Sequence, residues 1–260
     1  MAIKEIQCKG ILTKSNLPEA DYCINPYVGC SHGCSYCYAS FMRRFTGHTE
    51  EWGRFLDVKI NAPAVLDKQL TTRKKKGIIL IGSVTDAYQP VEKQYGITRD
   101  ILKILAKHEF PVSILTKSAL VKRDIDIIKQ INSCEVGMTI TSLNEAYSKI
   151  FEPAGSAPQE RLDTLLFFKD NKIKTYAFIG PILPGVTEID GILLAVKNRV
   201  DYVMFEFLNL TKANRDKVAA CYKKSGIVFD ENLFDWGKIE KKALEVCKKE
   251  NIPVKGFYKH

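Results

Sequence analysis

Short continuous apolar runs alternate with amphipathic segments along most of the chain. The apolar runs predict buried strands at 77–82, 111–116, 135–141, 173–179, 201–207 and 252–257. Between them, apolar residues recur at helical spacing, which predicts helices at 98–108, 124–131, 159–170, 188–197, 213–224 and 236–249. Strands that alternate with helices of this length favour a parallel sheet with right-handed crossovers.

A further strand predicted at 21–28 joins the five strands between residues 77 and 207 to make a set of six. The alternation does not separate a barrel from a doubly wound sheet, but in both folds the site lies at the carboxyl ends of the strands. We find no linker-like composition, which predicts one domain over 1–260. Its core covers about 21–225, and a helix and a strand extend it over 226–260.

Composition narrows the class of protein only slightly. The 260 residues are 45% hydrophobic, which is ordinary for a globular core. No apolar stretch reaches about 18 residues and no apolar leader opens the chain, which predicts a cytoplasmic protein with reduced cysteines and no membrane partner. The net charge of +9 admits an anionic partner such as a nucleic acid, but lysines on a solvated surface are the favoured explanation.

Three cysteines, Cys30, Cys34 and Cys37, carry the strongest chemical signal, with the spacing C-x3-C-x2-C. Closed zinc sites and ordinary iron–sulfur clusters take four protein ligands. Three thiolates on a four-iron cluster leave one iron free, and a small molecule can bind and react there. The alternative is a zinc site in which His32 is the fourth ligand.

Polar residues follow several predicted strands at the edge where a site is expected. They lie in the runs 83–92, 116–118 and 139–143. Hydroxyl groups at such positions can hydrogen-bond a carboxylate or ribose oxygens, and the Lys117 ammonium adds a charge-assisted bond to a carboxylate.

The cysteine motif resembles that of the radical S-adenosylmethionine (SAM) enzymes. The runs G-C-x-H-x-C-x-Y-C-Y, G-S-V-T-D-x-Y-Q-P-x-E, L-T-K-S, E-P-x(6)-E-R-L and 48–59 are similar to the spore photoproduct lyase-like group of that superfamily, over residues 25 to about 185. The resemblance implies an α/β fold, a partial (β/α)6 TIM-like barrel of the radical SAM type. It also implies a 4Fe-4S cluster and SAM as cofactors, and an external one-electron reductant of the flavodoxin or ferredoxin type. The reduced cluster cleaves SAM, and the resulting 5′-deoxyadenosyl radical abstracts hydrogen from a substrate.

The resemblance also assigns roles to residues of this chain. It implies that Cys30, Cys34 and Cys37 ligate the cluster, that Tyr36 faces the adenine, and that Thr85, Lys117 and Thr139 bind SAM. Each SAM assignment has a plainer alternative. Tyr36 suits core packing, Lys117 suits a solvated surface, and the two threonines suit turns at strand ends. Arg161, in the last of the matching runs, equally suits a charged helix surface.

One departure changes the expected substrate. The hydrogen-donating cysteine of the lyase aligns with Ser83, and a hydroxyl does not return a hydrogen atom as a thiol does. This and the short chain argue against repair of thymine dimers. Other members of the broader group act on other substrates, and one cleaves queuine, a 7-deazaguanine base. The prediction is therefore a radical SAM lyase that fragments a modified nucleobase or nucleoside, with a queuine-like base favoured. The alternatives are a DNA photoproduct lyase and a non-enzymatic, metal-bearing nucleic-acid-binding protein.

Candidate substrate-binding residues come from two regions of the chain. Glu206 and Asn209, at the end of the last core strand, offer a carboxylate and an amide to the donors of a guanine-like edge. The alternative for Glu206 is a helix cap or a lysine partner. Tyr27, His48 and Lys59 flank the cysteine motif and are expected to line the cavity. The sequence leaves the catalytic hydrogen donor unknown.

Overall fold

The computed structural model describes residues 1–73 and 75–259 and divides them into two compact units. The first unit consists of Met1–Gly33 and Ala39–Val136. The second consists of Cys34–Tyr38 and the chain from Gly137 onward. The cysteine motif therefore contributes to both units, and the prediction of a single domain remains untested.

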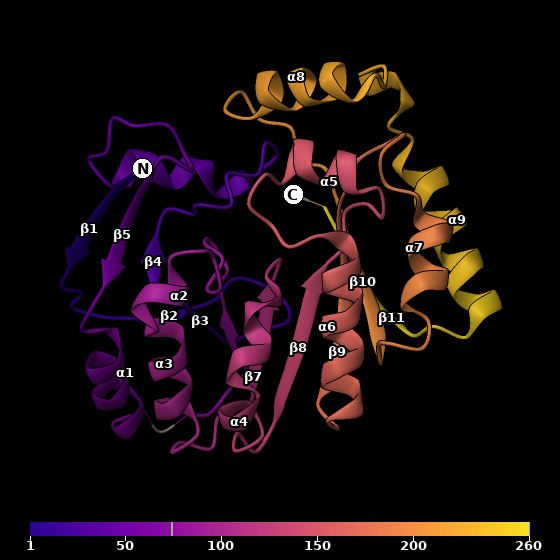
Figure 1. The fold of residues 1–260 in the computed structure, drawn as a ribbon. Helices are drawn as coiled ribbons and strands as arrows, with labels where there is room; N and C mark the ends of the chain where they lie inside the picture. Colours follow the sequence, from indigo (N-terminus) through magenta and orange to yellow (C-terminus); the bar gives the residue numbers. More distant parts are fainter. Residues whose placement is uncertain (74, 260) are drawn as a thin grey trace. The chain divides into compact units, whose positions relative to one another are not determined.

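The first unit contains two sheets, drawn in indigo to magenta in Figure 1. In one, the order is β2-β3-β6-β7, with β3, β6 and β7 parallel and β2 antiparallel to β3. The other has the order β1-β5-β4. The strands are β1 (Ala2–Ile6), β2 (Leu12–Lys14), β3 (Tyr22–Ile24), β4 (Tyr27–Val28), β5 (Phe55–Lys59), β6 (Ile79–Ile81) and β7 (Val112–Thr116).

The two longest helices of the first unit, α1 and α3, each bury an apolar face. In α3, the apolar residues Ile101, Leu102 and Leu105 are fully buried, as the spacing of an amphipathic helix requires, and α3 contacts α1. The helices are η1 (Tyr38–Phe45, mostly in this unit), α1 (Ala62–Thr71), α2 (Glu92–Tyr95), α3 (Ile97–Leu105), η2 (Ala119–Asp124) and α4 (Ile125–Ile128).

The second unit is built on parallel strands, with β9 paired to β10 and β10 to β11. These strands are β8 (Cys134–Thr139, of which residues 137–139 belong here), β9 (Lys174–Ile182), β10 (Tyr202–Phe207) and β11 (Val254–Tyr258). In Figure 1, α7 and α9 run side by side next to them, in agreement with their contacts. The helices are α5 (Glu145–Phe151), α6 (Pro158–Asp170), α7 (Ile189–Val196), α8 (Arg215–Ser225), η3 (Glu231–Leu233) and α9 (Trp236–Glu250).

Most predicted strands and helices occur within a few residues of their predicted bounds, and two regions differ. The strand predicted at 21–28 is two strands, because Pro26 has no N–H for a ladder and separates β3, which pairs with β6, from β4, which pairs with β5. The helix predicted at 124–131 is a 3-10 turn followed by the short α4. The sequence reasoning missed the strands β1, β2 and β5 and the helices α1, α2 and α5.

A buried carboxylate joins three segments of the first unit. The Glu92 side chain is 0% exposed and accepts hydrogen bonds from the Tyr27 hydroxyl, the Thr98 amide at 2.9 Å and Arg123 Nη2 at 2.7 Å. Burial and the neighbouring Glu92 carboxylate raise the pKa of Tyr27, which therefore remains a donor. These three donors, one of which is an arginine, compensate the cost of burying this charge.

We expect Glu92→Ala to lower the free energy of unfolding by about 3 kcal/mol or more, because it removes the acceptor of the buried Tyr27 hydroxyl and one of the two carboxylate partners of Arg123. Urea unfolding of the apoprotein measures this. The matched control is Glu109→Ala, which removes an exposed partner of Lys76 and should change stability little. Equal effects of the two variants would contradict a structural role for Glu92.

Candidate functional site

In the first unit, residues that follow β6 hold the turn that carries Cys30. The Thr85 hydroxyl donates to the Gly29 carbonyl at 2.5 Å, and the Gln89 side chain accepts from the Ser31 amide at 2.7 Å. Gln89 also donates to the Thr85 hydroxyl at 3.0 Å. Gly29 has φ of +91°, and a Cβ there would lie 2.6 Å from the Phe55 carbonyl oxygen, so only glycine fits. The turn before and after Cys30 is thus fixed by buried side chains.

The motif histidine lies against a buried carboxylate. His32 is 1% exposed, and its Nε2 is 3.3 Å from Asp86 Oδ2. Asp86 also accepts from the Thr116 hydroxyl at 2.6 Å and from the Lys117 amide at 2.8 Å. Burial alone would raise the pKa of Asp86, but His32 and these donors hold it well below its ordinary value. His32 is therefore packed on an ionised Asp86.

In the second unit, three hydrogen bonds hold the segment that carries Cys34 and Cys37. The Ser35 amide donates to the Phe151 carbonyl at 2.9 Å, and Asn214 Nδ2 donates to the Tyr36 carbonyl at 3.1 Å. The Tyr36 hydroxyl donates to the Glu152 carboxylate. The Tyr36 ring packs in an apolar cluster that includes Phe151.

The predicted SAM-binding residues have these surroundings. Thr85 is buried and uses its hydroxyl on the cysteine turn. Lys117 is half-buried at the end of β7 and donates its amide to Asp86. Thr139 is buried at the end of β8, and its carbonyl accepts from Arg161 Nη1 at 3.0 Å. Tyr36 is buried, which agrees with core packing, the alternative role given for it above. Their roles toward SAM remain predictions.

Tyr27, His48 and Lys59 all lie in the first unit, and their polar groups have protein partners. Tyr27 is buried against Glu92. His48 stacks on Phe55 at 4.0 Å between ring centroids, and its ring nitrogens lie 3.2 Å from Glu50 and 2.9 Å from Asp57. A substrate contact through a His48 nitrogen would require one of these pairs to break.

Of Tyr27, His48 and Lys59, Lys59 is the residue that is connected to Ser83, through Asn25. Its Nζ donates to the Asn25 carbonyl at 2.8 Å, and Asn25 Nδ2 donates to the Ser83 hydroxyl at 3.0 Å. Burial lowers the pKa of Lys59. Two hydrogen bonds thus connect Lys59 with Ser83 through Asn25. The sequence reasoning singled out Lys59 and Ser83 separately and did not select Asn25.

Glu206 and Asn209 belong to the second unit, at and just beyond the end of β10. Both are half-buried. A Cβ added at Gly180 would lie 2.8 Å from the Glu206 Cβ, so Glu206 packs closely on the backbone of β9. The Asn209 carbonyl accepts from Asn214 Nδ2 at 2.9 Å. Their predicted contact with a nucleobase is not tested by these interactions.

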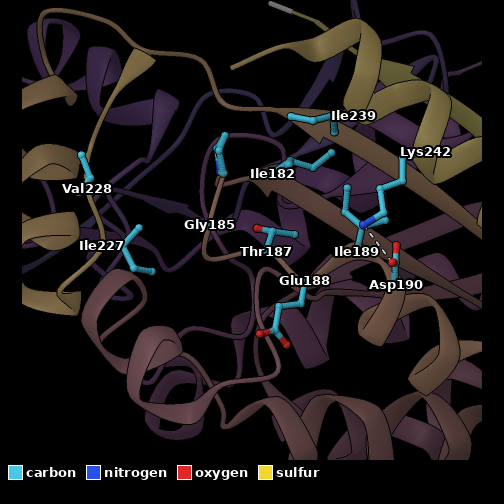
Figure 2. Close-up of a pocket in the computed structure, with 11 residues that line it drawn as sticks. Ile182, Gly185, Thr187, Glu188, Ile189, Asp190, Ile227, Val228, Ile239 and Lys242 are labelled. Carbon is cyan, nitrogen blue, oxygen red and sulfur yellow. Dashed lines mark ion pairs between the residues drawn. The ribbon is translucent and has the colours of Figure 1, made fainter. Parts of the chain in front are cut away.

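A pocket of about 530 Å³ also lies in the second unit, next to the end of β9 (Figure 2). Its walls include Ile182, Ile189 and Ile239, and its rim carries the ion pair between Lys242 Nζ and Asp190 Oδ2 at 2.9 Å. None of the predicted site residues lines it.

Comparison with known proteins identifies the family. The model of the radical SAM superfamily matches residues 24–194, and the chain belongs to that superfamily. An uncharacterised protein of Methanocaldococcus jannaschii is 37% identical over 99% of this chain and 98% of its own length. The radical SAM Nα-GlyT isomerase of Pseudomonas phage M6 is 22% identical over 64% of this chain and 34% of its own length.

Solved structures confirm the predicted fold class, a partial barrel of the radical SAM type. Spore photoproduct lyase with a dinucleoside spore photoproduct matches with a TM-score of 0.74, 16% identity and coverage of 98% of this chain and 81% of the lyase chain. Streptococcus suis SuiB bound to S-adenosylmethionine matches with a TM-score of 0.64, 11% identity and coverage of 92% and 50%. At these identities the likeness concerns the fold.

The cofactors of this enzyme family are a 4Fe-4S cluster and SAM, as predicted. The donor set fits the cluster, because three soft thiols lie on one short loop whose backbone is held on both sides of the motif. Among the described residues, no three His, Cys, Asp or Glu side chains are grouped around a single-ion site. A cluster does not require that grouping, because each thiolate ligates a different iron.

Within the described chain, we find no helix with the length and apolar content needed to cross a bilayer.

Asp86 provides a test of the electrostatics beside the cysteine turn. We expect Asp86→Asn to destabilise the apoprotein at pH 7 by about 1–3 kcal/mol, because hydrogen bonds to a charged acceptor are lost. The pKa of Asp86 is lower in the folded protein, so its contribution is fully present above the unfolded pKa of about 3.9. It is lost as the pH falls toward the folded pKa.

The difference between wild type and Asp86→Asn in urea unfolding should therefore shrink from pH 7 to pH 3. A difference that is independent of pH would mean that Asp86 acts through packing and not through its charge.

Proposed function

We propose that this protein is a cytoplasmic radical SAM lyase that fragments a modified nucleobase or nucleoside, with a queuine-like 7-deazaguanine favoured. Cys30, Cys34 and Cys37 hold the cluster in this proposal, and Tyr36, Thr85, Lys117 and Thr139 surround SAM. When bound, the cluster and SAM supply hydrogen-atom abstraction, and an external flavodoxin or ferredoxin supplies the electron.

The main support is the combination of a cluster motif held by buried side chains with a fold like that of spore photoproduct lyase over 98% of the chain. The solved lyase contains a dinucleoside, which favours a nucleoside-like substrate. Glu206 and Asn209 remain our candidates for the base edge, with Tyr27, His48 and Lys59 as further substrate-side residues. Lys59 and Ser83 are linked through Asn25 and add polar groups in the first unit.

The second candidate function is repair of a DNA photoproduct. The likeness to the lyase and the net charge of +9 favour it. Ser83 counts against it, because its hydroxyl stands where the lyase has a hydrogen-donating thiol, and it accepts a hydrogen bond from Asn25. Membership of an enzyme superfamily makes a purely structural, nucleic-acid-binding metal protein the weakest of the three hypotheses.

Anaerobic reconstitution tests the proposal. We expect about four irons and four sulfides per chain. With SAM and dithionite, 5′-deoxyadenosine measured by mass spectrometry should rise above the substrate-free background with queuine or its nucleoside, and a fragmented base should accompany it. Stimulation by thymine-dimer DNA or spore photoproduct instead would favour repair. One zinc per chain without sulfide, or a loaded cluster that yields no 5′-deoxyadenosine under any condition, would reject the radical SAM activity itself.

Lys117 is expected to bind the SAM carboxylate. We expect Lys117→Ala to weaken SAM binding by about 10- to 100-fold, the loss of one charge-assisted hydrogen bond, while iron content is unchanged. Equilibrium binding to the reconstituted protein measures this. The control is Lys107→Ala, an exposed lysine ahead of the same strand. Unchanged SAM affinity in Lys117→Ala would withdraw the assignment.

A further inference from the structure

An ion pair lies in the core of the second unit, where charges are rarely placed. Glu152 is 2% exposed and Arg161 is 1% exposed, and Arg161 Nη2 lies 2.5 Å from Glu152 Oε2. The remaining guanidinium nitrogens are also used. Nε donates to the Ser156 carbonyl at 2.7 Å, and Nη1 donates to the Thr139 carbonyl at 3.0 Å. Burial alone would lower the pKa of Arg161, but the Glu152 carboxylate raises it, so the guanidinium stays charged.

A buried pair of this kind is a poor source of stability. Removing two ions from water costs several kcal/mol per ion, and apolar side chains of similar volume often serve the core as well. The pair also requires special backbone, since a Cβ at Gly155 would lie 2.5 Å from Arg161 Nη2. Its presence therefore calls for a reason other than packing.

The pair acts on the cysteine segment through Tyr36. Glu152 Oε1 accepts from the Tyr36 hydroxyl and, at 2.8 Å, from the Thr141 hydroxyl. Tyr36 lies between Cys34 and Cys37 in the chain, and Cys34 packs against the apolar cluster that contains Tyr36.

We infer that the Glu152–Arg161 pair is a positioning device for the Cys34–Cys37 turn, acting through Tyr36, and that its balanced charge sets the reduction potential of the cluster. This inference rests on the proposed function, because it assumes that these cysteines ligate the cluster. The Glu152 charge fixes the tyrosine, and Arg161 cancels the field that the carboxylate would otherwise impose on the thiolates. Cluster charge and the charges around it are what tune such potentials.

Removing the two charges one at a time should shift the midpoint potential in opposite directions. A loss of packing alone gives no such difference in sign. Glu152→Gln keeps the acceptor for Tyr36 but leaves the Arg161 charge uncompensated, so the midpoint potential should become more positive. Arg161→Met leaves the Glu152 charge uncompensated, so the potential should become more negative. The double variant should return toward the wild-type potential. A redox titration of the reconstituted protein, followed by electron paramagnetic resonance, measures these shifts.

Two further variants separate positioning from folding. Tyr36→Phe keeps the ring in the core but removes the hydroxyl, and it should change the resonance spectrum of the reduced cluster at normal iron content. Thr175→Val removes a buried hydroxyl of the same unit that bonds the Arg199 carbonyl at 2.9 Å, and it should leave the spectrum and the potential unchanged.

The outcomes are distinguishable. Shifts of opposite sign in the two single variants support the inference. Shifts of the same sign, unaltered potentials, or an equal effect of Thr175→Val would overturn it and reduce the pair to a structural element. If the wild-type protein binds no cluster or cleaves no SAM, the proposed function fails instead, and that result comes before any variant is compared. If Arg161→Met does not fold, Glu152→Gln and Tyr36→Phe still decide the case.

Discussion

The cysteine motif depends on side chains far away in the chain that hold its backbone. A short loop with two glycines and three thiols has little structure of its own, and conformational freedom would disfavour any fixed arrangement of the thiols. Thr85 and Gln89 bind the backbone around Cys30 in the first unit. Asn214 and Glu152 hold the Tyr36 backbone and side chain in the second. Each unit thus fixes its own part of the motif through protein contacts.

These anchors explain why polar residues follow the strands. The hydroxyl groups in the run after β6 predict a binding site there. The structure shows that Thr85 and Asp86 contact the motif loop itself. A residue of this kind serves a cofactor indirectly, because ligands held by a rigid surrounding lose less entropy when a cofactor binds. Direct SAM contact and loop anchoring are compatible at such positions, since a hydroxyl both donates and accepts.

The sequence predicted the elements well where a local pattern decides them, and less well elsewhere. The period of α3 and the apolar run of β9 are local signals, and both elements occur. Strand β1 alternates too weakly to be recognised, and it exists because it pairs in parallel with β5, some fifty residues later. Pro26 splits one predicted strand in two, a boundary that the sequence does contain but that the apolar run obscured.

The candidate site likewise contains residues that a local sequence pattern predicts and residues that only the fold brings together. Spacing alone singled out the three cysteines, because they lie close together in the chain. The partners of the motif lie 56 to 178 residues from it, as with Thr85 to Gly29 and Asn214 to Tyr36, and no single-sequence pattern joins them. Arg161 is the clearest case. As part of an amphipathic helix it fits a solvated charge, but it is buried with Glu152, nine residues earlier, and only the fold shows that the two charges cancel beside Tyr36. A buried charge pair contributes little to stability, so its hydrogen bond to Tyr36, between two of the three cysteines, is the better basis for assigning it a role.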